Sequence, residues 1–335
     1  METLTLPKSN DPCWCGSGKK FKRCHKDSGP SLKAPTVLPG HISAIRPVPA
    51  NIVRPDYVDN RGKPKHANYP IIKSPAMIEK MREACQAAAQ VVEIVRPHVK
   101  PGITKDEIDA ITHQAYIDLG GYPSTVTYGG FPKSVCTSIN EVICHGIPDD
   151  RPLQDGDIMN VDVTIFLNGV HGDHSVMFEV GNVDEQSHRL VQITKECMEL
   201  GIAAIRPGLP VNVIGRAIEA HAKKFGYGVV RAFIGHGIGE AFHMKPNIPH
   251  YYDRHANHIM LPGMTFTVEP MITMSGSWDY DMWDDDWTVV TKDLARTAQW
   301  EHTVLVTDDG VEILTVLPDS SAKGPANNSS EQNLL

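Results

Sequence analysis

The sequence predicts an α+β fold in which two related halves follow a short cysteine-rich motif. Two pairs of helical patterns recur at a constant spacing of 106 residues, and strand-like apolar runs follow each pair. This spacing connects Pro101-Gly102-Ile103 with Pro207-Gly208-Leu209, Ile108 with Ile214, and Gly120 with Gly226. Two helices followed by antiparallel strands, used twice, are typical of a duplicated α+β unit.

Length and composition limit the class of protein. The chain has 335 residues, 41% of them hydrophobic, which allows about two domains or one large domain with an appendage. Apolar runs stay short of the ~20 residues of a membrane helix, and the first residues lack the apolar core of a secretory signal, so we expect a cytoplasmic protein without a membrane partner. The net charge of -8 argues against a protein whose main task is to bind nucleic acid. Seven cysteines, an odd number without a secretion signal, favour metal binding or buried thiols over a disulfide framework.

Helix signals mark the first half. Ser74 and Pro75 can cap and open a helix over 75–95, which Arg96-Pro97 ends. Thr104 and Glu107 form a capping box for a second helix that stops at Gly120. Strands are expected at 158–167 and 176–180, with residues 171–175 between them.

The second half repeats this order. Apolar residues at helical spacing predict helices over 190–205 and 213–225, which end at Gly208 and Gly226. Apolar runs at 265–274 and 303–316 predict strands.

The chain thereby divides into four segments. Residues 10–27 hold the cysteine-rich motif, and residues 28–73 form a proline-rich, extended arm or linker, because proline blocks helix formation. Residues 74–317 form the duplicated domain, and the Ser- and Asn-rich residues 318–335 are expected to be a disordered tail.

Charged residues interrupt the apolar strands of the duplicated domain. They are Asp162, Asp173, Glu269 and Glu301, together with the glycine-flanked His236. Each has a simpler interpretation when taken alone: a hydrogen-bonded strand residue, an Asx turn, a strand end, or a histidine that tolerates unusual backbone. A buried carboxylate is costly unless it is paired or binds a metal, and Lys or Arg is not regularly placed nearby. Together the five residues therefore predict a site for a pair of divalent ions.

These residues and their surroundings resemble the type I methionine aminopeptidases, binuclear metallopeptidases with the pita-bread fold of two αβ halves related by a pseudo-two-fold axis. The resemblance covers about residues 70–316. The matching motifs are Phe131-Pro132-Lys133-Ser134, Asn140-Glu141, Cys144-His145-Gly146-Ile147-Pro148, Gly172-Asp173, Gly235-His236-Gly237 and Trp300-Glu301-His302-Thr303. The proline-rich arm resembles the N-terminal extension of eukaryotic-type members.

The resemblance implies a role for each site residue. Asp162, Asp173, His236, Glu269 and Glu301 would be the metal ligands, with Asp173 and Glu301 bridging two ions of Co, Mn, Fe or Zn. Water activated by the metal pair would attack the scissile carbonyl, and Glu269 would carry its proton. His243 would stabilise the oxyanion, and His145 would contact the scissile amide or the backbone after it.

The resemblance also places a methionine pocket. Its members would be Tyr128, Phe131, Cys136, Phe242 and Trp287, for which ordinary core packing is the alternative. Residues 281–286 are expected to be a solvated acidic loop at the pocket mouth. His174 stands where many members of the family have a smaller residue.

The cysteine-rich motif predicts a structural zinc site. Its spacing is Cys-x-Cys, eight residues, then Cys-His, which supplies the tetrahedral set Cys13, Cys15, Cys24 and His25. The motif resembles the SEC-C knuckle. Its basic residues lead to the hypothesis of docking on an acidic partner such as the ribosome, and a solvated basic surface without a partner is the alternative.

Taken together, the sequence predicts a metalloaminopeptidase that removes the initiator methionine from nascent proteins with a small second residue. An aminopeptidase P or prolidase shares the fold and is the first alternative. The others are a non-catalytic pita-bread protein that binds ribosomes or RNA, and a zinc-knuckle adaptor with a passive large domain. A monomer is expected from the family resemblance.

Overall fold

The computed structural model describes residues 20, 22, 37–65 and 68–317. The zinc set predicted at Cys13, Cys15, Cys24 and His25 lies outside the described residues, and so does the predicted tail at 318–335. Within the described part of the chain, no helix is long and apolar enough to cross a membrane.

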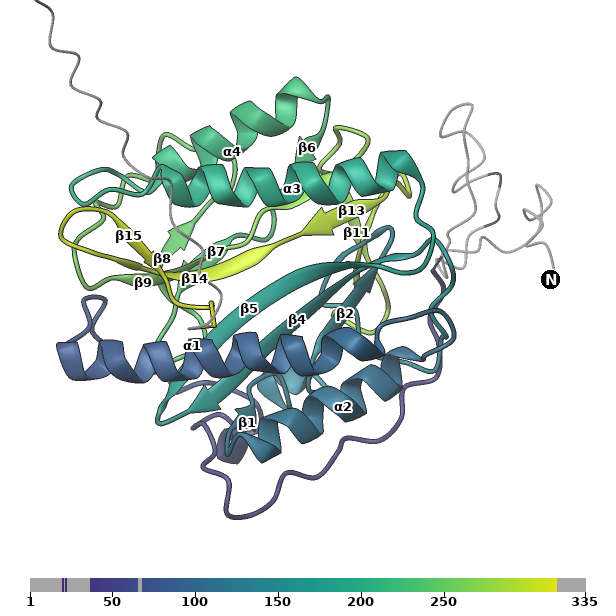
Figure 1. Cartoon of the computed structure of the whole chain (residues 1–335), viewed down its shortest axis with the longest axis horizontal. Helices are drawn as coiled ribbons and strands as arrows, with labels where there is room; N and C mark the ends of the chain where they lie inside the picture. The colour runs from purple at the N-terminus through teal and green to yellow at the C-terminus, as the bar shows by residue number, and fades with distance from the viewer. Residues whose placement is uncertain (1–19, 21, 23–36, 66–67, 318–335) are drawn as a thin grey trace, which may run out of the picture.

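Four α-helices and a set of mostly short strands build the domain (Figure 1). The helices are α1 (Pro75–Val95), α2 (Lys105–Asp118), α3 (Glu185–Ala203) and α4 (Asn212–Lys224), with 3-10 turns η2 (Val58–Asn60), η3 (Arg96–His98) and η4 (Tyr128–Gly130). The strands are β1 (Tyr122–Pro123), β2 (Cys136–Ile139), β3 (Val142–Cys144), β4 (Ile158–Leu167), β5 (Val170–Glu179), β6 (Gly228–Val229), β7 (Gly235–Gly237), β8 (Met244–Ile248), β9 (Thr265–Val268), β10 (Met271–Thr273), β11 (Tyr280–Met282), β12 (Val289–Thr291), β13 (Thr297–Gln299), β14 (Glu301–Val306) and β15 (Val311–Ile313).

The helix ends confirm the 106-residue repeat. Gly102 and Gly208 follow the first helix of each half with φ of 96° and 84°, and Gly120 and Gly226 follow the second with 75° and 73°. Glycine adopts positive φ without the steric penalty that other residues meet, so the same residue recurs where the same turn recurs. The predicted caps form as well: the Ser74 side chain accepts a hydrogen bond from the Met77 amide, and Thr104 and Glu107 make a capping box.

One long antiparallel sheet joins the two halves. Its strand order is β1-β4-β5-β14-β9-β7-β8, with β2 paired to β4 and β15 to β14. The halves meet where β5 pairs with β14, between the helix pair α1 and α2 and the pair α3 and α4 (Figure 1). Residues from both halves are therefore neighbours at this junction.

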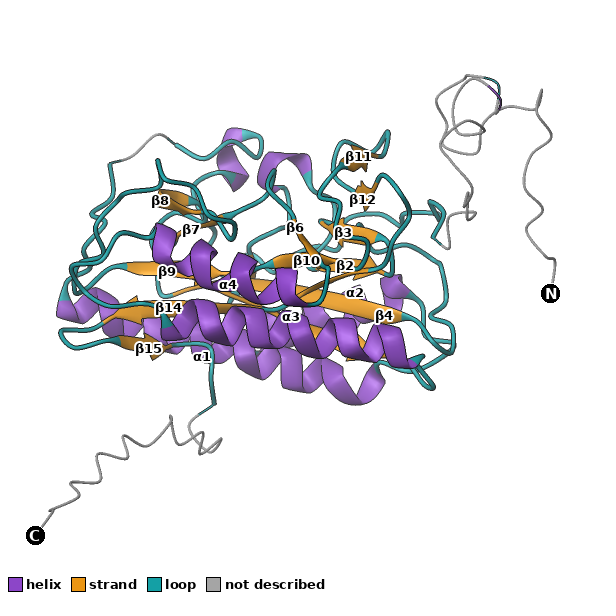
Figure 2. Ribbon diagram, turned by 90° about the horizontal axis from the view of Figure 1, so that it is seen from above, coloured by secondary structure: helices purple, strands orange, loops and turns teal. Residues whose placement is uncertain are grey.

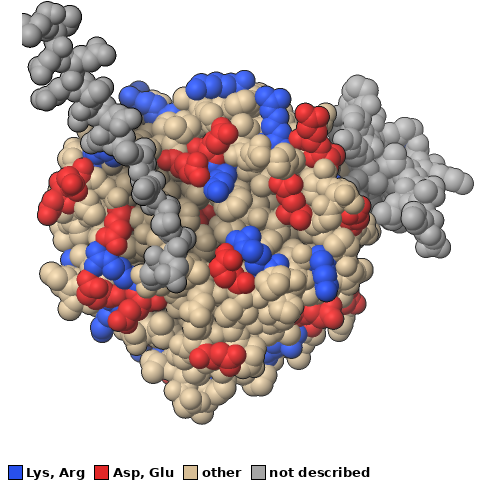
Figure 3. Space-filling model, in the orientation of Figure 1, with Lys and Arg blue, Asp and Glu red and all other residues tan. Residues whose placement is uncertain are grey.

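Each half has its own apolar core. Ile108 lies in the core that forms around α1, α2 and β4, and its repeat partner Ile214 lies in the core around α3, α4 and β9; both are fully buried. Strands β8, β11 and β12 stand on the side of the sheet away from α1 (Figure 2). On the face shown in Figure 3, basic and acidic side chains are interspersed, without a patch of one sign.

The structure corrects the predicted strand limits. The strand expected at 176–180 begins at Val170, because Asn168 and Gly169, both at positive φ, form a tight two-residue turn after β4. Asp173 therefore lies inside β5 rather than before it. Pro270, which cannot donate to a ladder, divides the run 265–274 into β9 and β10. The run 303–316 becomes the hairpin β14–β15, which begins at Glu301.

The arm ahead of α1 is attached to the domain by polar groups. The Val37 amide donates to the Glu141 carboxylate (2.8 Å) and the Gly40 amide to Asp149 (3.0 Å). Arg46 donates to Asp109 (2.9 Å), whose carboxylate is fully buried. Each contact fixes a different point of the segment to the first half of the domain.

Tyr57 is a deeply buried aromatic side chain of this arm. It is 1% exposed, its hydroxyl donates to the Ser124 carbonyl (2.5 Å), and its ring meets the edge of Tyr128 at 5.0 Å. The arm thus forms part of the wall behind η4.

We expect Tyr57→Ala to lower the free energy of unfolding by about 3–5 kcal/mol, because it leaves a cavity where a buried ring was packed. Tyr57→Phe should cost about 1 kcal/mol, since only the hydroxyl contact is lost. Val53, 69% exposed in the same arm, is the matched control, and Val53→Ala should stay within about 0.5 kcal/mol of the unchanged chain. Urea unfolding measures all three; equal midpoints for Tyr57→Ala and Val53→Ala would contradict this packing.

Candidate active site

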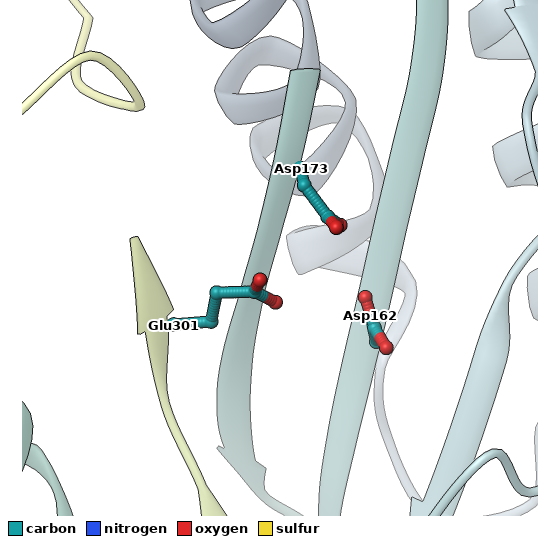
Figure 4. Close-up of side chains that lie close together, drawn as sticks. All are labelled: Asp162, Asp173 and Glu301. Atoms are coloured by element: carbon teal, nitrogen blue, oxygen red, sulfur yellow. The ribbon is translucent and has the colours of Figure 1, made fainter. Parts of the chain in front are cut away.

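Three carboxylates from three strands converge at the junction of the halves. Asp162 on β4, Asp173 on β5 and Glu301 on β14 have carboxylate oxygens within 4.8 Å of one another (Figure 4). Ser175 pairs with Asp162 on one side and with Glu301 on the other, and Asp173 lies two residues from Ser175 on the same strand. Because side chains alternate along a strand, this register puts all three carboxylates on one face of the sheet.

Two residues of the second half join this group. His236 on β7 places Nε2 3.8 Å from Asp173 Oδ2 and 3.6 Å from Glu269 Oε1, and Glu269 directly follows β9. The five residues predicted as ligands are therefore brought together, although they are spread over 140 positions of the sequence.

Threonines hold these carboxylates in place. Thr164 donates to Asp173 Oδ1 and Thr267 to Glu269 Oε1, each at 2.7 Å, and Thr303 donates to the Asp173 carbonyl at 2.8 Å. These residues were not predicted from the sequence. Each stands two positions from a carboxylate on the same strand face, as Asp-x-Thr, Thr-x-Glu and Glu-x-Thr, and this period-2 pattern is the signal that could have identified them.

In the described part of the chain, the charge of the carboxylates is not balanced by a basic side chain. Among the described residues, no Lys or Arg nitrogen lies within 4.0 Å of Asp162, Asp173, Glu269 or Glu301. Burial raises the pKa of Asp162 to about 7, and that of Glu269 to about 8. Burial and the neighbouring carboxylates raise the pKa of Asp173 and Glu301 well above their usual range.

His236 does not supply the missing positive charge. Burial lowers its pKa to about 4, so the ring is neutral near pH 7 and is available as a nitrogen ligand. Four carboxylates and one neutral imidazole, without a counter-cation among the residues that the structure describes, make a donor set that fits divalent ions with oxygen and nitrogen ligands.

A pocket of about 300 Å³ opens beside this cluster. All five residues predicted for the methionine pocket line it: Tyr128, Phe131, Cys136, Phe242 and Trp287. Wall residues that were not predicted are Thr125, Ala232, Phe233, Ile234 and Met271. The aromatic walls pack on one another, with Phe131 edge-on to Trp287 at 5.1 Å and Tyr128 at 5.0 Å from Phe242.

Both predicted catalytic histidines face the pocket. His243 places Nδ1 2.8 Å from the Tyr128 hydroxyl, whose pKa burial raises to about 12. His145 has a φ of 56°, a conformation that is uncommon outside glycine, and its ring is edge-on to Phe233 and Trp287. The next residue must be glycine, since a Cβ on Gly146 would lie 2.2 Å from the Thr137 carbonyl.

His174 lies on the opposite face of the sheet. Its ring stacks on His302 at 4.9 Å, and its Nδ1 is 2.7 Å from the Glu301 carbonyl oxygen. The His174 side chain therefore contacts the backbone of β14 at Glu301 from the face of the sheet opposite the carboxylates, and it does not enter the pocket.

The comparisons with known proteins identify the family and the relatives that this chain resembles. The model of metallopeptidase family M24 matches residues 79–308, and that of the SEC-C motif matches residues 10–27. The chain is 52% identical to methionine aminopeptidase 2 of Mycobacterium tuberculosis over 281 residues, 83% of this chain and 97% of the relative. The crystal structure of methionine aminopeptidase from Rickettsia prowazekii superposes with a TM-score of 0.71 at 45% identity, over 73% of this chain and 99% of that one. A prolidase from Pyrococcus furiosus shares the fold, with a TM-score of 0.59 at 22% identity, over 73% of this chain and 65% of that one.

The raised carboxylate pKa values predict that protein treated with a chelator loses stability as pH rises from about 7.5 to 9. In this window the folded chain binds more protons than the unfolded chain, whose carboxyls titrate near 4, so unfolding becomes easier with increasing pH. The buried imidazoles, whose pKa is lowered by burial, oppose this trend at lower pH, and their effect fades above about pH 7.5, where the imidazoles of the unfolded chain have also lost their protons. We expect the melting temperature to fall by about 2–5 °C, and excess Mn²⁺ or Co²⁺ to remove the fall.

Calorimetry with and without the chelator measures this effect. Asp162→Asn is the matched control, because it removes one titrating carboxylate at almost unchanged side-chain volume. In this variant the melting temperature of the chelated protein should decrease less with increasing pH. A melting temperature that rises over this pH range in the chelated protein would refute the charge assignment.

Proposed function

The chain belongs to metallopeptidase family M24, and within it to the methionine aminopeptidases, and we propose that it removes the initiator methionine from nascent polypeptides whose second residue is small. The observation that carries this proposal is the apolar pocket beside five convergent acidic and imidazole groups. A peptide seated there has its first side chain against aromatic walls and its first peptide bond next to the carboxylates.

The metal assignment is part of this proposal. Five residues would hold two divalent ions: Asp162, Asp173, His236, Glu269 and Glu301. Co, Mn, Fe or Zn suits such a donor set. When bound, the ions would lower the pKa of water and polarise the scissile carbonyl. The absence of a basic partner for these carboxylates among the described residues supports the assignment.

Glu269 is suited to receive the proton of the attacking water. Its Oε1 accepts from Thr267 at 2.7 Å, and its Oε2 lies 3.3 Å from the Gln299 amide, so the carboxylate is fixed in one orientation. A base held this way can take a proton and return it to the leaving amine.

His243 would donate a hydrogen bond to the scissile carbonyl. When the Tyr128 hydroxyl donates to Nδ1, the neutral ring carries its single proton on Nε2, from which it can stabilise the oxyanion. His145, on the neighbouring wall, would contact the scissile amide or the backbone after it.

The pocket chemistry suits a methionine side chain. Tyr128, Phe131, Phe242 and Trp287 provide aromatic surface, and Cys136 adds a buried thiol. A flexible thioether gains from contact with aromatic rings, and its loss of water contact supplies binding energy.

The alternatives are less well supported. A prolidase-type enzyme shares the fold, but the Pyrococcus furiosus likeness at 22% identity extends to the fold alone. A non-catalytic scaffold or an adaptor would not need five convergent ligand groups.

The N-terminal motif has a separate proposed role. Cys13, Cys15, Cys24 and His25 would bind one structural zinc ion, and the match of residues 10–27 to the SEC-C motif supports this. The basic residues of the motif would place the enzyme, a cytoplasmic monomer, on the ribosome, where N-termini emerge.

Release of methionine tests the main proposal. Protein reconstituted with divalent metal should liberate methionine from Met-Gly-Gly and leave Ala-Pro-Gly intact. Glu269→Ala should lower kcat about a hundredfold to ten-thousandfold, because a ligand and a proton carrier are lost together. Glu199→Ala, on the exposed surface of α3, is the control. An unchanged rate in Glu269→Ala would refute the site assignment.

A second experiment addresses the motif. Elemental analysis of the chelator-washed chain should find about one zinc per protein that Cys13→Ser removes. Replacing Lys19, Lys20 and Lys22 with Glu should abolish co-sedimentation with ribosomes without changing Met-Gly-Gly hydrolysis. Persistence of co-sedimentation would exclude the basic surface as the ribosome contact.

A further inference from the structure

A second depression lies next to the candidate active-site pocket. It has a volume of about 400 Å³ and is lined by Arg231, Ala232, Trp278, Asp279, Tyr280 and Lys292. Ala232 lines both the active-site pocket and this depression, so the depression continues the pocket outward. Its aromatic wall comes from β11 and the residues before it, on the side of the sheet away from α1 (Figure 2). The last two residues of β11, Asp281 and Met282, belong to residues 281–286, which the sequence analysis assigned to a loop.

A row of aromatic rings leads from the active site to this depression. The His145 ring is 5.4 Å from Phe233, and the Phe233 ring is 5.5 Å from Tyr280. The Tyr280 ring is therefore at most about 11 Å from that of His145. An extended peptide advances about 3.3 Å per residue, so this distance corresponds to about three residues after the scissile bond.

The walls of the depression combine two exposed aromatic rings with charged side chains whose charges are largely balanced. Trp278 is 44% exposed and Tyr280 is 40% exposed. Arg231 lies 4.0 Å over the Trp278 ring and bonds Glu219 at 3.3 Å, so its charge already has a partner and it fixes the indole. Asp279 and Lys292 contribute opposite charges. Such a surface gains most from an uncharged side chain that covers the two rings.

The backbone of β11 offers a second mode of contact. In the described strands β11 pairs only with β12, so its other edge is open to an extended peptide. A peptide that adds as a strand to this edge gains affinity from its backbone, whatever its sequence. The neighbouring Trp278 and Tyr280 rings would then select the peptide side chain that lies against them.

We propose that this depression is a substrate subsite that binds an apolar or aromatic side chain at the third or fourth position of the nascent polypeptide. The proposal rests on the proposed function, because the polypeptide enters the depression from the active site. It makes Trp278 and Tyr280 determinants of specificity that act on substrate beyond the second residue.

Peptides of equal length test the proposal. The substrates are Met-Ala-Gly-Gly, Met-Ala-Phe-Gly and Met-Ala-Gly-Phe, with methionine release measured as kcat/KM. We expect at least one phenylalanine peptide to exceed the glycine peptide about tenfold, the effect of burying one ring. Trp278→Ala and Tyr280→Ala, made singly, should each reduce this preference to about twofold or less and leave Met-Ala-Gly-Gly turnover unchanged. That turnover also reports that each variant is folded.

Tyr252→Ala is the matched control. Tyr252 is also 44% exposed and lies under an arginine, with Arg216 at 4.6 Å, but it does not line the depression. Its replacement should keep the preference intact. Equal kcat/KM for all three peptides, or a preference that survives both substitutions, would overturn the subsite alone. Failure to release methionine from any peptide would overturn the proposed function and the subsite with it.

Discussion

The rest of the structure depends on one electrostatic constraint, the burial of four carboxylates without a basic partner among the described residues. Unpaired buried charge is among the costliest features a fold can contain, and the raised pKa values of these groups express that cost. Divalent cations held by these carboxylates would relieve that cost, and ion binding would then stabilise the folded chain. The constraint also accounts for the hydroxyl donors beside Asp173 and Glu269, which hold each carboxylate next to its neighbours.

The duplicated architecture meets this constraint by dividing the site between its halves. Asp162 and Asp173 come from the hairpin β4–β5, whereas His236, Glu269 and Glu301 come from the second half, on β7, directly after β9 and on β14. Because β5 pairs with β14 at the junction, the two contributions share one face of one sheet. Each half also has its own core, so the ladder between them is supported from both sides. Threonines two residues from the carboxylates complete the arrangement with hydroxyl donors.

Aromatic residues extend the site beyond the carboxylates in two directions. On one side, Tyr57 of the arm packs against Tyr128, which contacts His243, so the segment preceding α1 supports a proposed catalytic residue. On the other side, Phe233 separates the pocket from Tyr280 on β11. On both sides, aromatic rings pack against one another to extend the site. None of these rings belongs to the sheet that carries the carboxylates. Specificity can therefore vary at the walls while the charged centre stays fixed.

The sequence by itself determined the duplicated α+β fold, the helix caps and the five residues of the charged cluster. These follow from local rules, such as glycine at positive φ after a helix, and from the cost of acidic residues within apolar strands. Local rules do not explain why the Glu301 carboxylate lies beside those of Asp162 and Asp173. The reason is the strand register, in which Ser175 pairs with both Asp162 and Glu301. The start of β5, the insertion of Tyr57 and the second depression likewise required the tertiary structure. They depend on strand register and on contacts between residues distant in the chain, which local propensity and periodicity do not encode.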